Sequence, residues 1–183
     1  MMAGIGMVAL SPLIAVIAAA IKLDSPGPVM YRATRSGRDG APFTMYKFRT
    51  MQERRAAHGP KITTHADRRV TRVGRLLRPS RLDELPQLWN VLRGDMSFVG
   101  PRPERPFFVE QLSAQIPFYE QRHAVKPGLT GWAQIKYQYG SSVEDAMEKL
   151  RYDLYYIKHL SIAFDLSIVF DTVKVIMFGK GAK

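Results

Sequence analysis

The chain has 183 residues, a length that fits one domain with its own hydrophobic core, and it contains no cysteine, which excludes disulfide bonds and thiolate metal sites. The net charge of +11 is concentrated in one segment. Residues 32–82 contain 14 Lys/Arg and 3 Asp/Glu, whereas residues 83–183 contain 12 of each. Such a basic segment favours an anionic partner, namely nucleic acid, anionic lipid or a phosphorylated substrate.

The first 21 residues carry no charge. As one straight helix they would be about 31 Å long, close to the thickness of the hydrocarbon core of a bilayer. A signal peptide would need a basic segment before the apolar run, and none precedes it here. A transmembrane span and a re-entrant helix, which enters and leaves the membrane on the same face, are the two remaining interpretations.

Ser11-Pro12 lies at the midpoint of this apolar run. Pro12 has no backbone N–H and its ring crowds the carbonyl group of Val8, so we expect the helix to bend here. The Ser11 hydroxyl can satisfy the freed backbone, which makes a break at membrane depth tolerable and favours the re-entrant helix. The cations that follow the run predict a cytoplasmic location for the next segment: Arg32, Arg35, Arg38, Lys47 and Arg49.

Two β-prone stretches, around residues 29–31 and 43–48, follow a turn signal at 25–28 and predict a β-hairpin. Alternation along the second stretch places Lys47 on one face of the strand. Lys47 and Arg49 are therefore candidates for contacting an anion, although cations at a solvated strand edge would show the same pattern.

Residues 69–78 have an amphipathic helical pattern with arginines along the polar face. Such a helix suits a bilayer interface, where arginines can reach phosphate head groups, and a helix that binds a nucleic-acid groove would look similar. Pro79 predicts the end of this helix.

Asp83 and Glu84 follow the basic segment directly. Ser80 and Asp83 have the spacing of a capping box, so one interpretation is a helix start with acidic residues in its first turn. The other is phosphoryl transfer. One carboxylate can attack phosphorus or bind Mg²⁺, the second can accept a proton or support the metal, and Arg78 and Arg81 can offset phosphate charge.

Arg102 is flanked by Pro101 and Pro103, which predicts a rigid turn of the kind that a phosphate-binding arginine needs. Further along, Ser141 and Glu144 have the spacing of a helix N-cap. A second helix over residues 161–178 carries an apolar stripe that either packs on the domain or lies in a membrane interface.

Together these residues resemble the bacterial sugar transferase family, the monotopic phosphoglycosyl transferases that begin glycan assembly on polyprenyl phosphate. The matching segments cover most of residues 10–178 in order: LSPLIAVIAAAIKLDSPGPVMYR, FTMYKFRTM, RVGRLLRPSRLDELPQLWNVLRGDMSFVGPRPERP, HAVKPGLTGWAQI and YDLYYIKHLSIAFDL. Residues 139–161 look closest to the exopolysaccharide-type branch of the family.

Sequence pattern and resemblance together predict an α+β, mainly helical fold. A re-entrant membrane helix broken at Ser11-Pro12 is expected over residues 1–23, and a compact catalytic domain with interfacial amphipathic helices and a small β-hairpin over 24–183. The expected location is the cytoplasmic face of the bacterial inner membrane. Family members usually carry a basic and aromatic segment before the apolar run, so either the chain is the catalytic region of a longer protein or its start is misassigned.

The resemblance also implies a ping-pong transfer of a phosphosugar from a UDP-sugar to undecaprenyl phosphate, with release of UMP. Asp83 would attack the β-phosphate and bind Mg²⁺, and Glu84 would support the metal or accept a proton. Contacts to substrate phosphate are expected from Arg78, Arg102, Lys47 and Arg49. The implied partners are the UDP-sugar, polyprenyl phosphate, the lipid bilayer and a second copy of the chain in a homodimer, but no nucleic acid.

A nucleic-acid-binding protein and a non-catalytic membrane scaffold are the alternatives. The first explains the arginines but neither the apolar run nor the acidic pair, and its affinity should fall steeply with salt. The second explains the first 80 residues and leaves the next 30 without a role.

Overall fold

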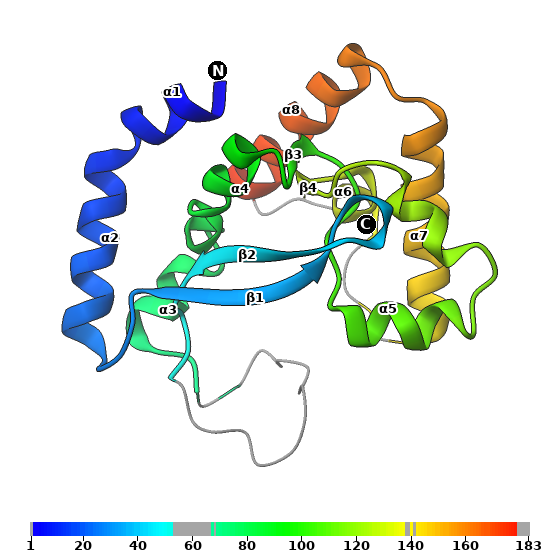
Figure 1. The fold of residues 1–183 in the computed structure, drawn as a ribbon. Coiled ribbons are helices and arrows are strands. Elements are labelled where there is room, and N and C mark those ends of the chain that lie inside the picture. Colours follow the sequence, from blue (N-terminus) through cyan, green and yellow to red (C-terminus); the bar gives the residue numbers. More distant parts are fainter. Residues whose placement is uncertain (1, 53–66, 68, 138–139, 141, 179–183) are drawn as a thin grey trace. The chain divides into compact units, whose positions relative to one another are not determined.

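The computed structural model describes residues 2–52, 67, 69–137, 140 and 142–178 (Figure 1). The chain forms two compact units. The first consists of Met1–Arg32 and Tyr46–Leu88, and the second of Ala33–Met45 and Trp89–Lys183. The division predicted from the sequence, into residues 1–23 and 24–183, depends on a membrane and stays a prediction.

The first unit begins with a bent pair of helices, α1 (Met2–Ala9) and α2 (Ser11–Asp24). The two helices meet at an angle of 62°. Pro12 cannot donate a backbone hydrogen bond to the carbonyl oxygen of Val8, and the Ser11 hydroxyl donates to that oxygen instead, at 2.8 Å. The bend therefore lies where the sequence predicts it, while its place in a membrane stays a prediction.

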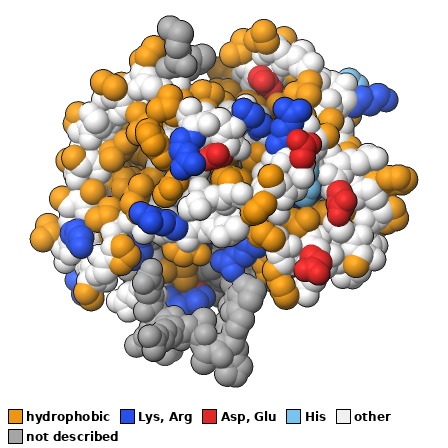
Figure 2. Space-filling model, viewed as in Figure 1, with side chains coloured by type: hydrophobic (Ala, Val, Ile, Leu, Met, Phe, Trp, Pro, Cys, Tyr) orange, Lys and Arg blue, Asp and Glu red, His pale blue; other side chains and the backbone are white. Residues whose placement is uncertain are grey.

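Among the helices within the described ranges, none is by itself both long and apolar enough to cross a bilayer. Taken together, α1 and α2 reach the required length and hydropathy, with the bend between them. Five large hydrophobic side chains of this pair are exposed: Ile5, Val8, Leu13, Val16 and Leu23. Hydrophobic side chains can be seen along the left edge of Figure 2, where Figure 1 draws this helix pair in the same view.

The core of the first unit forms on the opposite side of α2. Ile17 and Ile21 pack with Phe48 of β2 (Pro42–Phe48) and with Leu77 of α3 (Arg72–Leu77). At Gly74 of α3 a Cβ atom would overlap a backbone carbonyl of the neighbouring segment, so glycine is required for this close approach. The core therefore joins α2, β2 and α3 into one body.

The helix expected over residues 69–78 is shorter in the structure. Thr71 has an extended backbone and its Oγ1 accepts a hydrogen bond from the Gly74 N–H at 2.9 Å, so α3 starts only after Thr71. Val70 forms an isolated antiparallel bridge with Met51 instead. The helical pattern in the sequence extended too far because Val70, which lies in this bridge, has the same apolar spacing as the residues of α3.

The predicted hairpin is confirmed as β1 (Met30–Ser36) and β2, with a short 3-10 turn, η1 (Arg38–Gly40), between them. β1 runs five residues further than expected. Its distal half belongs to the second unit, where Ala33 packs with Met45 and Met96, and the Ser36 N–H donates to the Glu104 carbonyl at 2.9 Å. These tertiary contacts extend the strand beyond its β-prone residues.

The second unit contains most of the remaining elements. They are α4 (Gln87–Arg93, which starts in the first unit), β3 (Ser97–Val99), α5 (Pro106–Ser113), η3 (Tyr119–Ala124), β4 (Gly128–Thr130), α6 (Trp132–Lys136), α7 (Val143–Lys158) and α8 (Ile162–Phe178). β3 and β4 pair in parallel, with Ser97 opposite Gly128 and Val99 opposite Thr130. Helices thus prevail over two small sheets, in agreement with the predicted α+β, mainly helical class.

The two tail helices are confirmed as α7 and α8. The capping box of α7 consists of Ser142 and Asp145, one residue after the expected pair Ser141 and Glu144. Both pairs have the same serine-to-acid spacing, so the pattern alone could not distinguish them. Ser141 itself lies outside the described residues.

The apolar stripe predicted on α8 is not the face that packs. Ile168 is fully buried with Val99, Ile135 and Tyr156. The described members of the predicted stripe are exposed: Leu166, Val169, Phe170 and Val173. Core packing of this stripe was therefore the wrong alternative for those residues, and the side chains of Ile176 and Met177 lie outside the described part.

A buried ion pair joins η3 to α7. Arg122 and Asp153 are 6% and 2% exposed, and the Nε and Nη2 atoms of Arg122 donate to Asp153 Oδ2 at 3.1 and 2.8 Å. Nη1 also donates to the Tyr119 hydroxyl at 2.8 Å, and Nη2 to the carbonyl oxygen of Arg102 at 2.9 Å. The pair thereby holds the turn that carries Arg102.

Asp153→Ala should lower the free energy of unfolding by about 3–5 kcal/mol, because it leaves a buried guanidinium without its counter-charge. Glu148→Ala is the matched control on the same helix. Glu148 pairs with the exposed Arg151 at 2.9 Å, and loss of such a pair costs only about 0.5 kcal/mol. Chemical denaturation of the detergent-solubilised chain measures both, and equal effects would contradict a structural role for the buried pair.

Candidate active site

Asp83 and Glu84 lie in η2 (Leu82–Glu84), a single 3-10 turn between α3 and α4. The turn begins after Arg81, whose φ of 54° and ψ of 16° place it in the left-handed region. The Glu84 N–H donates to the Arg81 carbonyl at 3.0 Å and closes the turn. A non-glycine residue in this region is strained by about 1–3 kcal/mol, and such strain clusters at functional sites.

The capping-box interpretation of Ser80 and Asp83 is wrong. The Ser80 hydroxyl donates backwards to the carbonyl oxygens of Leu76 and Leu77, at 3.0 and 3.1 Å, and so satisfies the end of α3. The left-handed residue that follows separates Ser80 from the acidic turn. α4 begins only at Gln87, so the acidic pair does not start that helix.

The two adjacent carboxylates have different surroundings. Lys47 of β2 donates through Nζ to Glu84 Oε1 at 2.6 Å, and the two side chains are 15% and 14% exposed. A charge-assisted hydrogen bond with so little solvent access is stronger than a surface ion pair. Asp83, in contrast, forms no ion pair with any residue in the described part of the chain.

The pKa of the Asp83 carboxyl is raised above its ordinary value, chiefly because burial disfavours its charged form. The positive charge of Lys47 lowers this pKa in part, Glu84 raises it further, and Arg78 lowers it. A partly desolvated carboxylate beside cations is suited to act as a nucleophile toward phosphorus or as a ligand for a hard cation.

Arg78 is the C-cap residue of α3 and belongs to the same unit as the acidic pair. Its Nη1 atom is buried and has no hydrogen-bond partner among the atoms described. Buried donors are nearly always paired in proteins, so an orphan donor beside a carboxylate site is a reason to expect an anionic ligand there. Substrate phosphate as that ligand stays a prediction.

Arg49 is engaged elsewhere. Its side chain is 3% exposed, and Nη1 donates to the Pro26 carbonyl at 2.6 Å while Nη2 donates to the Ser25 carbonyl at 2.7 Å. These acceptors lie just after the C-terminal end of α2. Phosphate binding by Arg49 stays a prediction that no contact in the structure supports.

Arg102 belongs to the second unit, whereas Asp83, Glu84, Arg78 and Lys47 belong to the first. It lies in the proline-flanked turn that the sequence predicts. The flanking prolines are buried while the Arg102 side chain is exposed. The turn is pinned by backbone hydrogen bonds, from the Gly128 N–H to the Pro101 carbonyl at 3.0 Å and from the Gly100 N–H to the Thr130 carbonyl at 2.9 Å.

Within the described ranges, no group of three or more acidic, histidine or cysteine side chains could hold a metal ion. The carboxylates of Asp83 and Glu84 still fit Mg²⁺ that arrives with a substrate, because Mg²⁺ commonly takes one or two protein carboxylates plus substrate phosphates. Asp83 is the available carboxylate, since Glu84 is paired with Lys47.

Sequence reasoning missed the residues that support the site. Asp24, at the end of α2, accepts a hydrogen bond from the Val73 N–H at 3.0 Å and so caps α3. Arg122 and Asp153 support the backbone of Arg102. No local pattern reveals such contacts, because their partners lie 20 to 49 residues away along the chain.

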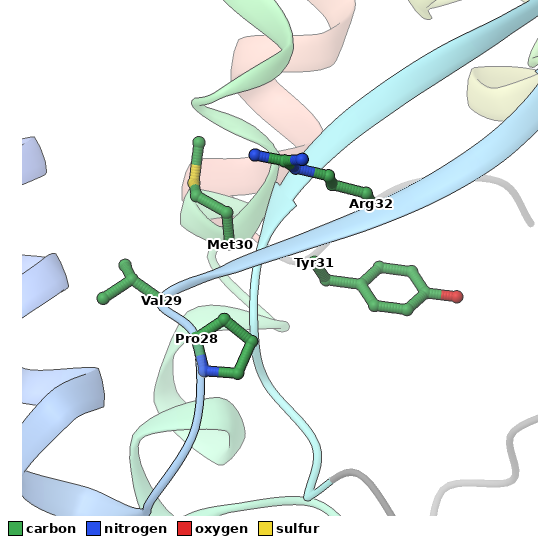
Figure 3. Close-up of a pocket in the computed structure, with 5 residues that line it drawn as sticks. All are labelled: Pro28, Val29, Met30, Tyr31 and Arg32. Carbon is green, nitrogen blue, oxygen red and sulfur yellow. The ribbon is translucent and has the colours of Figure 1, made fainter.

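A hollow of about 500 Å³ lies in the first unit, lined by Pro28, Val29, Met30, Tyr31 and Arg32. Met30 and Arg32 project from one side of β1 and Tyr31 from the other (Figure 3). The guanidinium carbon of Arg32 is 5.9 Å from the ring centroid of Tyr46. Apart from Arg32 the lining is uncharged, and it includes none of the candidate catalytic residues.

Comparison with known proteins gives the family. Residues 1–179 match the family described as bacterial sugar transferase. The chain is 48% identical over 173 residues to UDP-N-acetylgalactosamine-undecaprenyl-phosphate N-acetylgalactosaminephosphotransferase of Aeromonas hydrophila, covering 94% of this chain and 41% of the relative. It is 48% identical over 169 residues to UDP-glucose:undecaprenyl-phosphate glucose-1-phosphate transferase of Escherichia coli (strain K12), covering 90% and 36%.

A further relative has a length closer to that of this chain. The exopolysaccharide production protein PSS of Rhizobium leguminosarum bv. phaseoli is 42% identical over 176 residues, which is 91% of this chain and 86% of the relative. This chain spans less than half of the Aeromonas and Escherichia proteins, and the matched part contains the acidic pair and its supporting residues. The chain belongs to the bacterial sugar transferase family.

Proposed function

We propose that this chain transfers a phosphosugar from a UDP-sugar to undecaprenyl phosphate, giving an undecaprenyl diphosphate sugar and UMP. The names of the Aeromonas and Escherichia relatives support this reaction class. Within the chain, the proposal rests on the unequal partnering of two adjacent carboxylates. Glu84 is held by Lys47, while Asp83 forms no ion pair with a described residue and has a raised pKa.

In the first step, a carboxylate oxygen of Asp83 attacks the β-phosphorus of the UDP-sugar. The bond from that phosphorus to the oxygen bridging the two phosphates breaks, and its electron pair leaves with UMP. Asp83 then carries the phosphosugar as an acyl phosphate. The raised pKa favours this step because a more basic carboxylate is a better nucleophile.

In the second step, a phosphate oxygen of undecaprenyl phosphate attacks the same phosphorus. The bond between phosphorus and the Asp83 oxygen breaks, and the electron pair returns to the carboxylate. The two half-reactions form a ping-pong cycle. Glu84 keeps its contact with Lys47 throughout, which holds the ammonium group beside the transferred phosphate.

Asp83 is also the proposed ligand of Mg²⁺, which when bound would neutralise charge on the diphosphate. Arg78 is proposed to donate its unpartnered Nη1–H to phosphate, and Arg102 to present its guanidinium from the rigid turn. The proposed role of each arginine is to offset negative charge on substrate phosphate.

We propose further that α1 and α2 form a re-entrant helix at the cytoplasmic face of the bacterial inner membrane. Their 62° bend, the Ser11–Val8 hydrogen bond and their exposed hydrophobic side chains support this placement. With the backbone satisfied at the break, a bent pair can lie within hydrocarbon. The lipid substrate would then reach Asp83 from the membrane side.

Asp83→Asn should abolish UMP release from every UDP-sugar in a panel assayed with Mg²⁺ and undecaprenyl phosphate. The variant should also melt at a higher temperature at pH 7. Because the folded chain raises the pKa of Asp83, ionisation of this group lowers the free energy of unfolding, and Asn cannot ionise. The difference in melting temperature between Asp83→Asn and the parent should shrink as pH falls through the raised pKa, and vanish below the ordinary pKa of about 3.9.

UMP release by the parent with one donor, and none by the variant, would support the reaction and identify the sugar. Silence of the folded parent with every donor would exclude the proposed reaction. Turnover by Asp83→Asn would instead exclude Asp83 as the nucleophile.

Lys47→Met should move the acid limb of the rate profile to higher pH. Lys47 lowers the pKa of Asp83, and its removal also leaves the charge of Glu84 uncompensated, so Asp83 stays protonated to higher pH. The pH dependence of kcat/KM for UMP release measures this. Arg38→Met, in the exposed hairpin loop, is the control, and an acid limb unchanged by Lys47→Met would contradict the charge coupling.

Arg102→Ala should lower kcat/KM for the UDP-sugar by about 10- to 100-fold, the loss expected for a hydrogen bond to a charged group. Arg105→Ala is the control, because Arg105 lies three residues further, at the N-cap of α5. Equal effects of the two substitutions on steady-state kinetics would contradict phosphate binding by Arg102.

A further inference from the structure

The end of α2 is held by one buried side chain. The guanidinium of Arg49 donates to the carbonyl oxygens of Pro26 and Ser25, and also to the Ser25 hydroxyl at 3.0 Å and the Ile21 carbonyl at 3.4 Å. The last carbonyl groups of a helix lack partners within the helix, and a cation there also interacts favourably with the helix dipole. Arg49 supplies both a hydrogen-bond donor and a positive charge at this end of the helix.

Space for this guanidinium is made by Gly27. A Cβ atom at residue 27 would overlap Nη1 of Arg49, and the φ of Gly27 is +120°, which side chains rarely adopt. The backbone of Arg49 adds a further tie, because its N–H donates to the Val29 carbonyl at 2.9 Å. Both the side chain and the main chain of Arg49 are therefore fixed to residues 21–29.

The same short segment leads to the acidic pair. Lys47 lies in β2, two residues before Arg49, which directly follows the end of that strand. Lys47 is fixed in turn by its 2.6 Å contact with Glu84. The end of α2 and the acidic turn are thus connected through three residues of extended chain, with a buried cation at one end and a paired cation at the other.

A second connection runs in parallel. Asp24, on the last turn of α2, accepts a hydrogen bond from the Val73 N–H of α3, and α3 leads directly into the acidic turn. The position of α2 therefore determines both the strand that carries Lys47 and the helix that precedes Asp83.

We propose that Arg49 is a positioning residue, which fixes the end of the bent helix pair so that Lys47 stays against Glu84 and beside Asp83. The proposal deepens the transferase function proposed above and rests on it. Arg49 is not required to touch substrate. It acts through Lys47, so its loss frees Lys47 from its contact with Glu84.

Gly27→Ala tests this without changing any charge, because the new methyl group displaces the guanidinium. We expect kcat for UMP release to fall by about 10- to 100-fold, as for a small misplacement of a catalytic group. We also expect Lys47 to lose its contact with Glu84 and to become more accessible, as it is freed from its place beside the acidic turn. Gly40→Ala is the matched control, since Gly40 also has a positive φ, +74°, but has open space around its Cβ position.

Arg49→Ala combined with Gly27→Ala completes a double-mutant cycle. If Gly27→Ala acts through the guanidinium, it should add little to the loss caused by Arg49→Ala alone. Arg49→Lys should restore part of the activity, because it keeps the charge but reaches fewer of the carbonyl groups. Full additivity of Gly27→Ala and Arg49→Ala would overturn the proposal.

Acylation of Lys47 by an amine-reactive reagent, quantified by mass spectrometry, gives a readout that does not depend on turnover. Gly27→Ala should increase labelling of Lys47, and Gly40→Ala should not. If Gly27→Ala lowers the melting temperature but keeps the parental kcat and Lys47 labelling, Arg49 is only structural and the proposal fails. If no variant or parent releases UMP, yet labelling responds as expected, the transferase function fails and the positioning role stands.

Discussion

Carbonyl groups at the end of an apolar helix must find donors, and this requirement organises the first unit. α2 ends where the chain turns away over Ser25 and Pro26, and the buried guanidinium of Arg49 donates to the carbonyl groups of Ile21, Ser25 and Pro26 there. Burying a guanidinium is costly unless its hydrogen bonds are made, and four contacts from Nη1 and Nη2 offset this cost, while Nε has no partner among the described atoms. At the same end of α2, the carboxylate of Asp24 accepts a hydrogen bond from the Val73 N–H of α3. The two contacts set α2, β2 and α3 around the shared core of Ile17, Ile21, Phe48 and Leu77.

The acidic pair gains its chemistry from this frame. Neither its sequence nor its 3-10 turn distinguishes Asp83 from Glu84, but the lysine of β2 does, since it reaches only one of them. The left-handed Arg81 then turns the chain sharply between α3 and the pair. In the second unit, a buried Arg122–Asp153 pair supports the backbone of Arg102 in a similar way. In both units a buried arginine therefore holds backbone close in sequence to a residue that we propose to contact substrate phosphate.

Predictions from sequence succeeded where the cause is local. Pro12 removes a donor to Val8, and Ser11 is near enough to replace it, so the bend could be read from two residues. They failed where the partner is distant. Arg49 and Lys47 are both cations in the sequence FTMYKFRTM, and nothing there distinguishes their roles. Arg49 contacts the end of α2, 24 residues earlier in the chain, whereas Lys47 contacts the carboxylate of Glu84, 37 residues later. Ser80 has the correct spacing from Asp83 for a capping box. Its hydroxyl instead donates to the Leu76 carbonyl, and the left-handed backbone of Arg81, which separates Ser80 from the acidic turn, is not visible in the sequence.

The discontinuity of the first unit has a consequence for biosynthesis. Its two segments, Met1–Arg32 and Tyr46–Leu88, are separated by a piece of the other unit. Ile21 leaves the ribosome well before its core partner Leu77 has been made, an interval of a few seconds at ordinary rates of translation. Until Phe48 and Leu77 have followed, the apolar face of α2 lacks its core partners from β2 and α3. The nascent helix pair therefore exposes this apolar face until the second segment of its own unit has been made.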